Sequence, residues 1–462
     1  MANIFERGFE WMAERIAYYI PDVRQRALYG VQNYYEGNQP PQLKVKSGQA
    51  NDNISLNWLG LAVDRGVSML VGGGVEFILP EEADDQQEYI DGVWEANKKN
   101  LLLHSHATDG ALFGTPFMKI VPDGITSPYT DETFPRLVVL DPKLMKIECD
   151  PRDKEHVTAY IMEYRTTENG KEKLYREVTR RATPDDYDTP DIEPTTWVIE
   201  QWEFVSTWQK ISAVEWPYDF PPILHNKNLP SIHSIYGTSD IEQVINPQDK
   251  YNFVQSNNLK INRYHAHPKT WGAGFTKTDK TSWGADEMIT VSDPSGKIAN
   301  LEMSSDLSGA RSIAEDLKQA IFALARDVDI STLNDKMGQL TNFGLKLLYS
   351  DALAKVATKR LLYGEAYLEI NRRLLVLKGW EKLDSDPGYI RWGDELPINE
   401  SEEMEIDRAA LDLGIIDKQT VAERWAKRYG MEWDEIQERM TEEKANEQTL
   451  GSLLLRNFNR GQ

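Results

Sequence analysis

The chain has 462 residues and a formal net charge of −22, with 40% hydrophobic and 27% charged residues. These fractions are typical of a soluble globular protein, and a chain of this length is expected to form about two to four substructures. The single cysteine, Cys149, excludes a disulfide framework and a cysteine metal cluster. No uncharged run reaches the roughly 18 residues that would span a bilayer.

Tight binding of nucleic acid normally depends on a basic surface, so the charge argues against a protein that grips DNA or RNA. It fits either a solvated acidic surface or a surface that repels nucleic acid. The N-terminal sequence MANIFERGFEW carries three charges and lacks the apolar core of a signal peptide. We therefore expect a protein of a reducing cytoplasm.

Three helical segments are predicted in the first quarter of the chain, over 4–36, 55–71 and 86–113. Pro21 is expected to divide the first of them. Ser55 is the expected N-cap of the second, and the GGG that follows is its expected end.

The next part of the chain is predicted to be rich in strands. The runs VEFILP, PFMKIVPDG and PRLVVLDP are β-rich and bounded by turn residues. Three further strands are expected between Val157 and Glu215, with a loop at the proline- and aspartate-rich ATPDDYDTPDIEPTT. The first half of the chain is therefore expected to be α+β, with a substantial antiparallel sheet.

The segment from Tyr236 to Lys269 has the length of a helix but is too polar for a core helix, because many of its residues carry amide side chains. Asn246 is its expected N-cap, with Pro247 at the first helical position.

A second helix is predicted in SSDLSGARSIAEDLKQAIFALARDVD, with Ser304 or Ser305 as its N-cap. Its apolar residues recur at alternating spacings of three and four, which puts them on one face. They are Leu307, Ala310, Ala314, Leu317, Ile321, Leu324 and Val328.

Further helices are predicted toward the end of the chain. After DISTLNDKMGQLT, a proline-free run of about 34 residues that begins NFGLKLLYSDALAK is expected to form one helix of about 50 Å. Residues 401–446 are expected to be an acidic helical tail, with Gly414 and Gly430 as C-caps and Asp417 as an N-cap.

No motif in the chain predicts catalysis or a cofactor. LVGGGVEF lacks the lysine and hydroxyl residues of a phosphate-binding loop, and there is no Gly-x-Ser-x-Gly element. The HSH of His104 and His106 and the HAH of His265 and His267 place histidines two apart, which point in different directions on a helix. The 74 carboxylates leave a catalytic acidic pair open without indicating one.

Several motifs, taken in order, resemble the portal proteins of tailed bacteriophages, in particular the large family typified by portals of Bacillus phages. The resemblance runs from about Tyr34 to Trp392. Its markers are YYEGN, NWLGLAVDRGVSMLVGGGVEF, ALFGTPFMKIVPDG, RLVVLDPKLMKIECDPRD and the block that runs from FPPILHNKNLP through YGTSDIEQVINPQDKYNFVQSNNLKINRYHAHPKTWGAG. The order of these motifs, more than any one of them, carries the resemblance.

The resemblance implies an α+β portal fold with a wing, a helical stem, a β-rich clip and a helical crown, assembled as a ring. The implied parts are the wing over 1–235, the first stem helix over 236–265, the clip over 266–303, the second stem helix over 304–327, the tunnel loop over 328–341, a long wing helix with a returning strand over 342–400, and the crown over 401–462.

The resemblance also implies functional residues in three of these parts. Those expected in the stem are Asn252, Gln255, Asn258, Asn262, Leu317, Ile321 and Leu324. Those expected along the channel in the tunnel loop are Asp329, Thr332, Asn334, Asp335, Lys336, Met337 and Gln339. Those expected in the clip, as docking residues, are Lys269, Trp271, Lys277, Lys280, Trp283 and Lys297.

The function implied by the resemblance is that of a ring, expected to be a dodecamer, through which viral double-stranded DNA is packaged and ejected at one capsid vertex. Expected partners are the terminase motor and a head-completion adaptor at the clip, and the major capsid and scaffold proteins at the wing. Neither a cofactor nor a membrane is expected, and the protein would be a virion component assembled in the host cytoplasm. A capsid shell protein, or a metal-dependent nuclease or other hydrolase, are the alternatives.

An acidic channel would let DNA slide without sticking, because it repels phosphates. Lys336 is the one cation of the predicted tunnel loop. A weak contact of Lys336 with DNA and a merely solvated lysine are both open.

Overall fold

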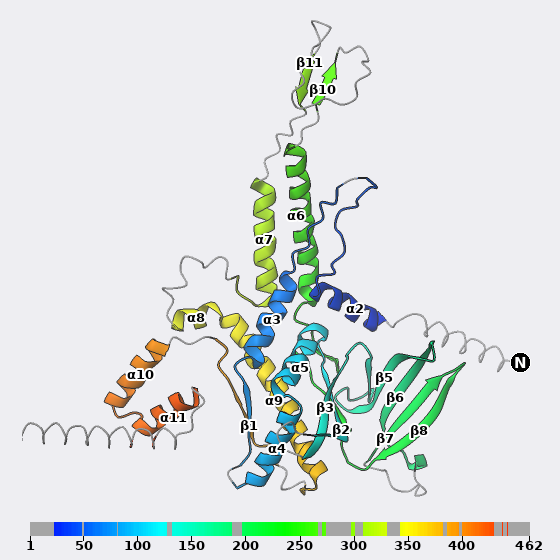
Figure 1. The fold of residues 1–462 in the computed structure, drawn as a ribbon, viewed down its shortest axis with the longest axis vertical. Coiled ribbons are helices and arrows are strands. Elements are labelled where there is room, and N and C mark those ends of the chain that lie inside the picture. Colours follow the sequence, from blue (N-terminus) through cyan, green and yellow to red (C-terminus); the bar gives the residue numbers. More distant parts are fainter. Residues whose placement is uncertain are drawn as a thin grey trace, which may run out of the picture. The chain divides into compact units, whose positions relative to one another are not determined.

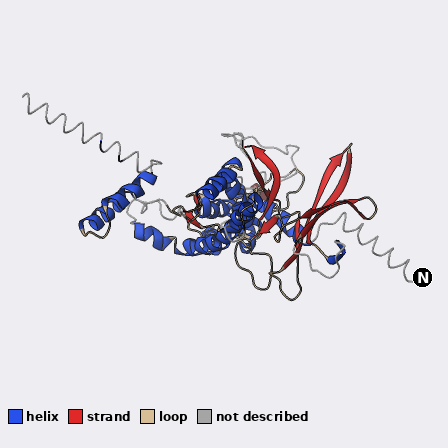
Figure 2. Ribbon diagram, turned by 90° about the horizontal axis from the view of Figure 1, so that it is seen from below, coloured by secondary structure: helices blue, strands red, loops and turns tan. Residues whose placement is uncertain are grey.

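The computed structural model describes residues 23–48, 50–80, 82–126, 132–186, 196–266, 270–273, 297–300, 308–329, 342–381, 386–396, 400–428, 437 and 441. They form helices and antiparallel strands, which confirms the predicted α+β class (Figure 1 and Figure 2). The chain divides into two compact units, the first made of 1–335 and 348–395 and the second of 336–347 and 396–462.

The helices of the first unit, apart from two that form a hairpin described below, are α2 (Val23–Tyr35), α3 (Trp58–Val71), α4 (Asp84–Ala96), α5 (Lys99–Phe113) and α9 (Ser350–Lys378). The single helix predicted over 86–113 is wrong, because Lys98 takes a left-handed conformation with a φ of 55° and separates α4 from α5. Beside it, Asn97 fixes the turn: its side chain donates to Pro135 O at 2.9 Å and accepts from Leu137 N at 2.8 Å.

The start of α3 also differs from the prediction, since Asn57 rather than Ser55 is the N-cap. The Oδ1 of Asn57 accepts from Gly60 N at 3.1 Å, and its Nδ2 donates to Tyr35 O at 2.7 Å. The second bond reaches the end of α2. A contact outside α3 therefore determines which residue caps it. The predicted end at the glycines is confirmed, with Gly72 as the C-cap.

The strands of the first unit form antiparallel sheets, as predicted. The five-stranded sheet has the order β4-β5-β6-β7-β8 and consists of β4 (Met145–Cys149), β5 (Val157–Glu168), β6 (Lys171–Arg181), β7 (Trp197–Phe204) and β8 (Trp208–Trp216). The three-stranded sheet has the order β3-β2-β9 and consists of β2 (Phe117–Thr126), β3 (Thr133–Leu140) and β9 (Ile223–His225). β1 (Val75–Ile78) pairs with β12 (Tyr389–Trp392).

A cluster of large apolar side chains joins the two larger sheets. Phe117 of β2, Tyr160 of β5 and Trp197 of β7 are each less than 5% exposed and belong to one buried core. Two aromatic residues at the start of the segment that leads to β9, Trp216 and Phe220, complete it, and Trp216 Nε1 donates to Phe220 O at 2.8 Å.

The predicted helix of about 34 residues after the tunnel loop is two helices. α8 (Asn342–Leu348) is followed by Tyr349, whose backbone leaves the helical region, and α9 begins after it. The boundary between the two compact units lies at this break. α9 ends at Gly379, which takes a left-handed φ of 113°.

The second unit contains α10 (Glu400–Asp412) and α11 (Lys418–Arg428). Gly414 ends α10 with a φ of 68°, and Asp417 caps α11 by accepting from Thr420 N at 2.7 Å, so both predicted caps are confirmed. The bond from Thr420 N lowers the pKa of the Asp417 carboxyl. Gly430 lies outside the described residues, as do residues 4–22 of the first predicted helical segment.

Two of the quoted motifs meet through their glycines. Gly114 of LFGTPF and Gly237 of YGTSD approach so closely that a Cβ on either would collide with the carbonyl oxygen of the other. Hydrogen bonds brace the contact: Asn228 N donates to Gly114 O at 2.8 Å, and Gly237 N donates to Thr115 Oγ1 at 2.9 Å. Only glycine allows the backbones to come this close, which explains these glycines by packing.

We predict that Gly237→Ala lowers the free energy of unfolding by about 1–3 kcal/mol, since the added methyl group forces two backbone segments apart. Gly30→Ala is the matched control. Gly30 lies inside α2 with nothing within 4 Å of a built Cβ, so alanine there should stabilise the protein by about 0.5–1 kcal/mol. Urea unfolding measures both, and equal stability of the two variants would contradict the packing argument.

Candidate channel stem and its buried anchor

Two helices form a hairpin that projects from the rest of the first unit and is called the stem below (Figure 1). α6 (Ile245–Ala266) and α7 (Ser308–Ala325) pack side by side. In the sequence between them, β10 (Thr270–Ala273) and β11 (Lys297–Asn300) pair in an antiparallel ladder. The predicted N-cap Asn246 is wrong, because the 3-10 turn η2 (Glu242–Val244) runs directly into α6. Ser304 and Ser305 lie outside the described residues.

The amide side chains of α6 have a partner in the same chain. Gln248, Asn252 and Ser256 stand four residues apart, so they share one face of the helix, and each is at most 1% exposed. They face the extended segment 50–57, whose backbone lies along α6.

Each of the three side chains bonds to the backbone of that segment. Ile54 N donates to Ser256 Oγ at 2.9 Å, and Leu56 N donates to the Asn252 amide oxygen at 3.1 Å. The Gln248 amide donates to Leu56 O at 2.5 Å. The side chains thus take the place of a neighbouring strand as hydrogen-bond partners of these backbone groups.

A salt bridge fixes the same segment farther along α6. The Arg263 guanidinium meets the Asp52 carboxylate through two contacts, Nε to Oδ1 at 2.8 Å and Nη2 to Oδ2 at 2.6 Å. These hydrogen bonds lower the pKa of the Asp52 carboxyl.

The predicted stem residues on α6 therefore have different surroundings. Asn252 is buried against its own chain, where its side-chain oxygen accepts from Leu56 N. Gln255 donates to Tyr251 Oη at 3.1 Å, Asn258 is half-buried and Asn262 is exposed. The sequence analysis missed Gln248 and Ser256, although their spacing of four from Asn252 was a usable signal.

The apolar seam predicted on the second stem helix is partly wrong. Ala314 and Ile321 are buried as expected, but Phe322 and Ala325 complete the buried face, while Leu317 is half-buried and Leu324 is 46% exposed. The predicted seam spans two adjacent faces: at about 100° per residue, Leu317 and Leu324 lie about 60° around the helix from Ala314 and Ile321, respectively, on the side that the chain covers less. Leu307 lies outside the described residues.

Trp58 of α3 joins the two stem helices at their base. Its ring lies edge-on to Tyr251 of α6, with centroids 6.3 Å apart, and edge-on to Phe322 of α7 at 5.8 Å.

α7 ends in a turn that carries a non-glycine residue in the left-handed region. Arg326 has a φ of 54°, and Asp327 N donates to Phe322 O at 2.9 Å, the pattern that closes many helix ends. Asp329, a predicted tunnel-loop residue, pairs with Lys318 of α7 at 2.7 Å.

The other predicted loop and clip residues have no described side chains. Trp271 lies on β10 and Lys297 on β11, where the structure describes the backbone pairing alone. Outside the described residues lie Thr332, Asn334, Asp335, Lys336, Met337 and Gln339 of the loop, and Lys269, Lys277, Lys280 and Trp283 of the clip.

A buried ionic cluster holds the base of the stem. The Asp240 carboxylate lies 2.5 Å from Lys359 Nζ, 3.3 Å from Lys355 Nζ and 3.0 Å from the Asn228 side-chain amide. Burial alone would raise the pKa of Asp240, but the two ammonium groups outweigh it and hold this pKa below the usual value. Burial lowers the pKa of Lys359 to about 8, against the attraction of Asp240.

The cluster connects three parts of the first unit. Asp240 closes the YGTSD motif just before η2 and α6, and both lysines belong to α9. Lys355 Nζ also donates to Ala325 O at 2.9 Å, the last carbonyl of α7. Both stem helices are therefore tied to α9 through these charges.

We predict that Asp240→Asn costs about 3–5 kcal/mol of unfolding free energy, because two buried ammonium groups lose their counter-charge. The further replacement Lys359→Met removes one of these charges and should recover part of the loss. Glu315→Gln, on an exposed residue of α7, is the control and should stay within about 0.5 kcal/mol of wild type. Chemical denaturation measures the free energy of unfolding of each variant. An unchanged midpoint for Asp240→Asn would show that the cluster is not stabilising.

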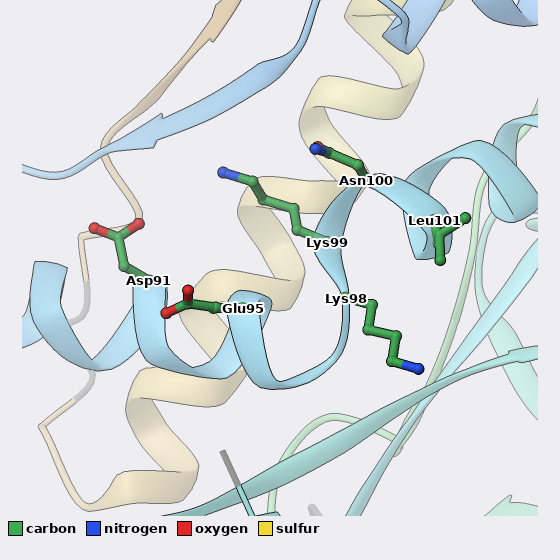
Figure 3. A pocket seen from close by; sticks show the side chains of 6 residues that line it. All are labelled: Asp91, Glu95, Lys98, Lys99, Asn100 and Leu101. Atoms are coloured by element: carbon green, nitrogen blue, oxygen red, sulfur yellow. The ribbon is translucent and has the colours of Figure 1, made fainter. Parts of the chain in front are cut away.

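A hollow of about 480 Å³ lies at the corner of α4 and α5, where Asp91 and Glu95 face the side of Lys99 while Lys98 points away (Figure 3). Its charges are mixed, as on an ordinary solvated surface. No three His, Cys, Asp or Glu side chains among the described residues are placed to hold a metal ion.

The predicted histidine pairs differ in their surroundings. His106 is fully buried, its Nδ1 lies 3.2 Å from Tyr367 Oη, and burial lowers its pKa to about 3, so it is a core residue. His104 is exposed, and the side chains of His265 and His267 lie outside the described set. Among the helices of the described part, none has the length and apolar character needed to cross a membrane.

Comparison with known proteins places this architecture in a family. The model of one family, described as phage portal protein, SPP1 Gp6-like, matches residues 24–450. A comparison with curated proteins gives no significant match. The family match covers most of the chain. It includes both stem helices, the rest of the described first unit from Arg24 onward (called the body below), and α10 and α11. The chain therefore belongs to the phage portal protein family, whose members are structural, DNA-packaging components of the bacteriophage capsid.

Proposed function

We propose that the protein assembles into a closed ring, a dodecamer, at one capsid vertex and forms the channel through which viral DNA is packaged and ejected. The observation that carries this proposal is the stem, a two-helix hairpin that stands on an α+β body and encloses a β-hairpin in sequence. A hairpin of this kind has too little core of its own and is expected to be completed by neighbouring copies.

The charge of the chain supports a channel without tight DNA binding. At −22 per chain, a ring repels phosphates on average, which favours sliding over adhesion. Gln255, Asn258 and Asn262 leave polar groups on the half-exposed part of α6. The tunnel loop and Lys336 remain proposed channel elements on the strength of the sequence alone.

The partners follow the same proposal. The β10–β11 hairpin, with Trp271 and Lys297, is the proposed clip and would dock the terminase motor and the head-completion adaptor. The body, with its five-stranded sheet, is the proposed wing and would meet the major capsid and scaffold proteins. Residues 401–462, which include most of α10 and all of α11, are the proposed crown.

Native mass spectrometry and negative-stain electron microscopy of the purified protein test the ring. We expect a single closed assembly with a central hole and a mass near twelve copies of the 52.9 kDa chain. A protein that stays monomeric across micromolar concentrations would contradict the proposal, and closed shells would favour a capsid shell protein instead.

A further inference from the structure

The apolar surface of α7 is wider than the part of it that other residues of the chain bury. At about 100° per residue, its apolar side chains spread over an arc of about 200°, whereas a helix that faces one core needs a stripe of only about 100°. Ala314, Ile321, Phe322 and Ala325 form the buried half of this arc. The described residues of the chain cover the other half only in part.

This half is a regular stripe, formed by Ile313, Leu317, Ala320 and Leu324. Ile313 is 53% exposed and Leu324 is 46% exposed, while the two residues between them are half-buried. The spacing of four, three and four is that of a seam between packed helices. We therefore expect another helix to pack on this stripe.

α6 carries an exposed aromatic residue on a face that its own chain leaves open. Phe253 is 43% exposed and lies on the same side of α6 as Asn246 and Asn257. It stands about 200° around the helix from Tyr251, the residue that packs on Trp58. This face therefore points away from the contact of α6 with Trp58.

The two exposed faces lie at the same height on the stem. α7 packs against η2, the turn that precedes α6, so the end of α7 and the start of α6 share one level. Leu317 lies eight residues before the end of α7 at Ala325, and Phe253 lies eight residues after the start of α6 at Ile245. At a rise of about 1.5 Å per residue, both are about 12 Å from the base.

We propose that the stripe Ile313–Leu317–Ala320–Leu324 of one copy packs on the Phe253 face of α6 in the next copy. The inference rests on the proposed ring, in which rotation about one axis keeps every copy at the same height, so groups of equal height meet. The contact is heterologous, because α7 of one subunit meets α6 of its neighbour.

Charges beside the two faces fit the same contact. Asp316 flanks the α7 stripe and Lys250 flanks Phe253, and both are exposed. The level of Asp316 lies about 6 Å above that of Lys250, within reach of a lysine side chain. Opposite charges at the rim would favour this register over others.

Cysteine cross-linking tests the contact, because Cys149 is the single cysteine of the chain. On a Cys149→Ser background, Leu317→Cys is combined with Phe253→Cys, and rings are first verified by mass photometry. Oxidation should then give covalent multimers up to the full ring, since a disulfide needs Cα atoms about 4.4–6.8 Å apart. The pair Leu324→Cys with Asn246→Cys repeats the test one level lower.

The control pair is Gln319→Cys with Phe253→Cys, because Gln319 is exposed on the far side of α7. It should give no covalent multimers. Intact rings in which neither matched pair cross-links, or in which the control pair cross-links equally well, would overturn this contact and leave the proposed ring standing. Absence of rings in the wild-type protein would instead refute the proposed function on which the contact rests.

Discussion

The buried carboxylate of Asp240 is the contact on which the position of the stem depends. It sits between Lys355 and Lys359 of α9 at the point where the chain leaves the body and enters the stem. A single charge with two buried counter-charges is costly to displace, because every alternative leaves at least one ion without a partner. Since Lys355 also holds the last carbonyl of α7, the beginning of one stem helix and the end of the other are fixed by the same cluster.

Two further features allow that cluster to form. The close approach of Gly114 and Gly237 places the YGTSD motif against the end of α5, and Asp240 of this motif therefore lies next to α9. The polar stripe of Gln248, Asn252 and Ser256 on α6 then binds the backbone of segment 50–57 through side-chain hydrogen bonds. A polar helix is thus stable at this place because Gln248, Asn252 and Ser256 hydrogen-bond to the same chain, and its remaining faces stay available for neighbours.

Local patterns predicted much of this architecture. Alternation and turn residues gave the antiparallel strands, and Gly414 and Asp417 behave as the caps that their residue types predict. The failures have long-range causes. Lys98 adopts a left-handed turn because Asn97 bonds to β3, and Asn57 displaces Ser55 as a cap because its amide reaches α2. The split of the α7 seam into a buried and a partly covered half also depends on what packs against it, which spacing alone does not reveal.

Hydrogen–deuterium exchange of the assembled wild-type protein tests the central claim most directly. If the Asp240 cluster and the polar stripe hold the stem to the body, the backbone amides of α6 from Gln248 to Ser256 should exchange as slowly as those of the central strands β5 to β7. Exchange of these amides as fast as that of the exposed edge strand β8, with β5 to β7 still protected, would contradict the account.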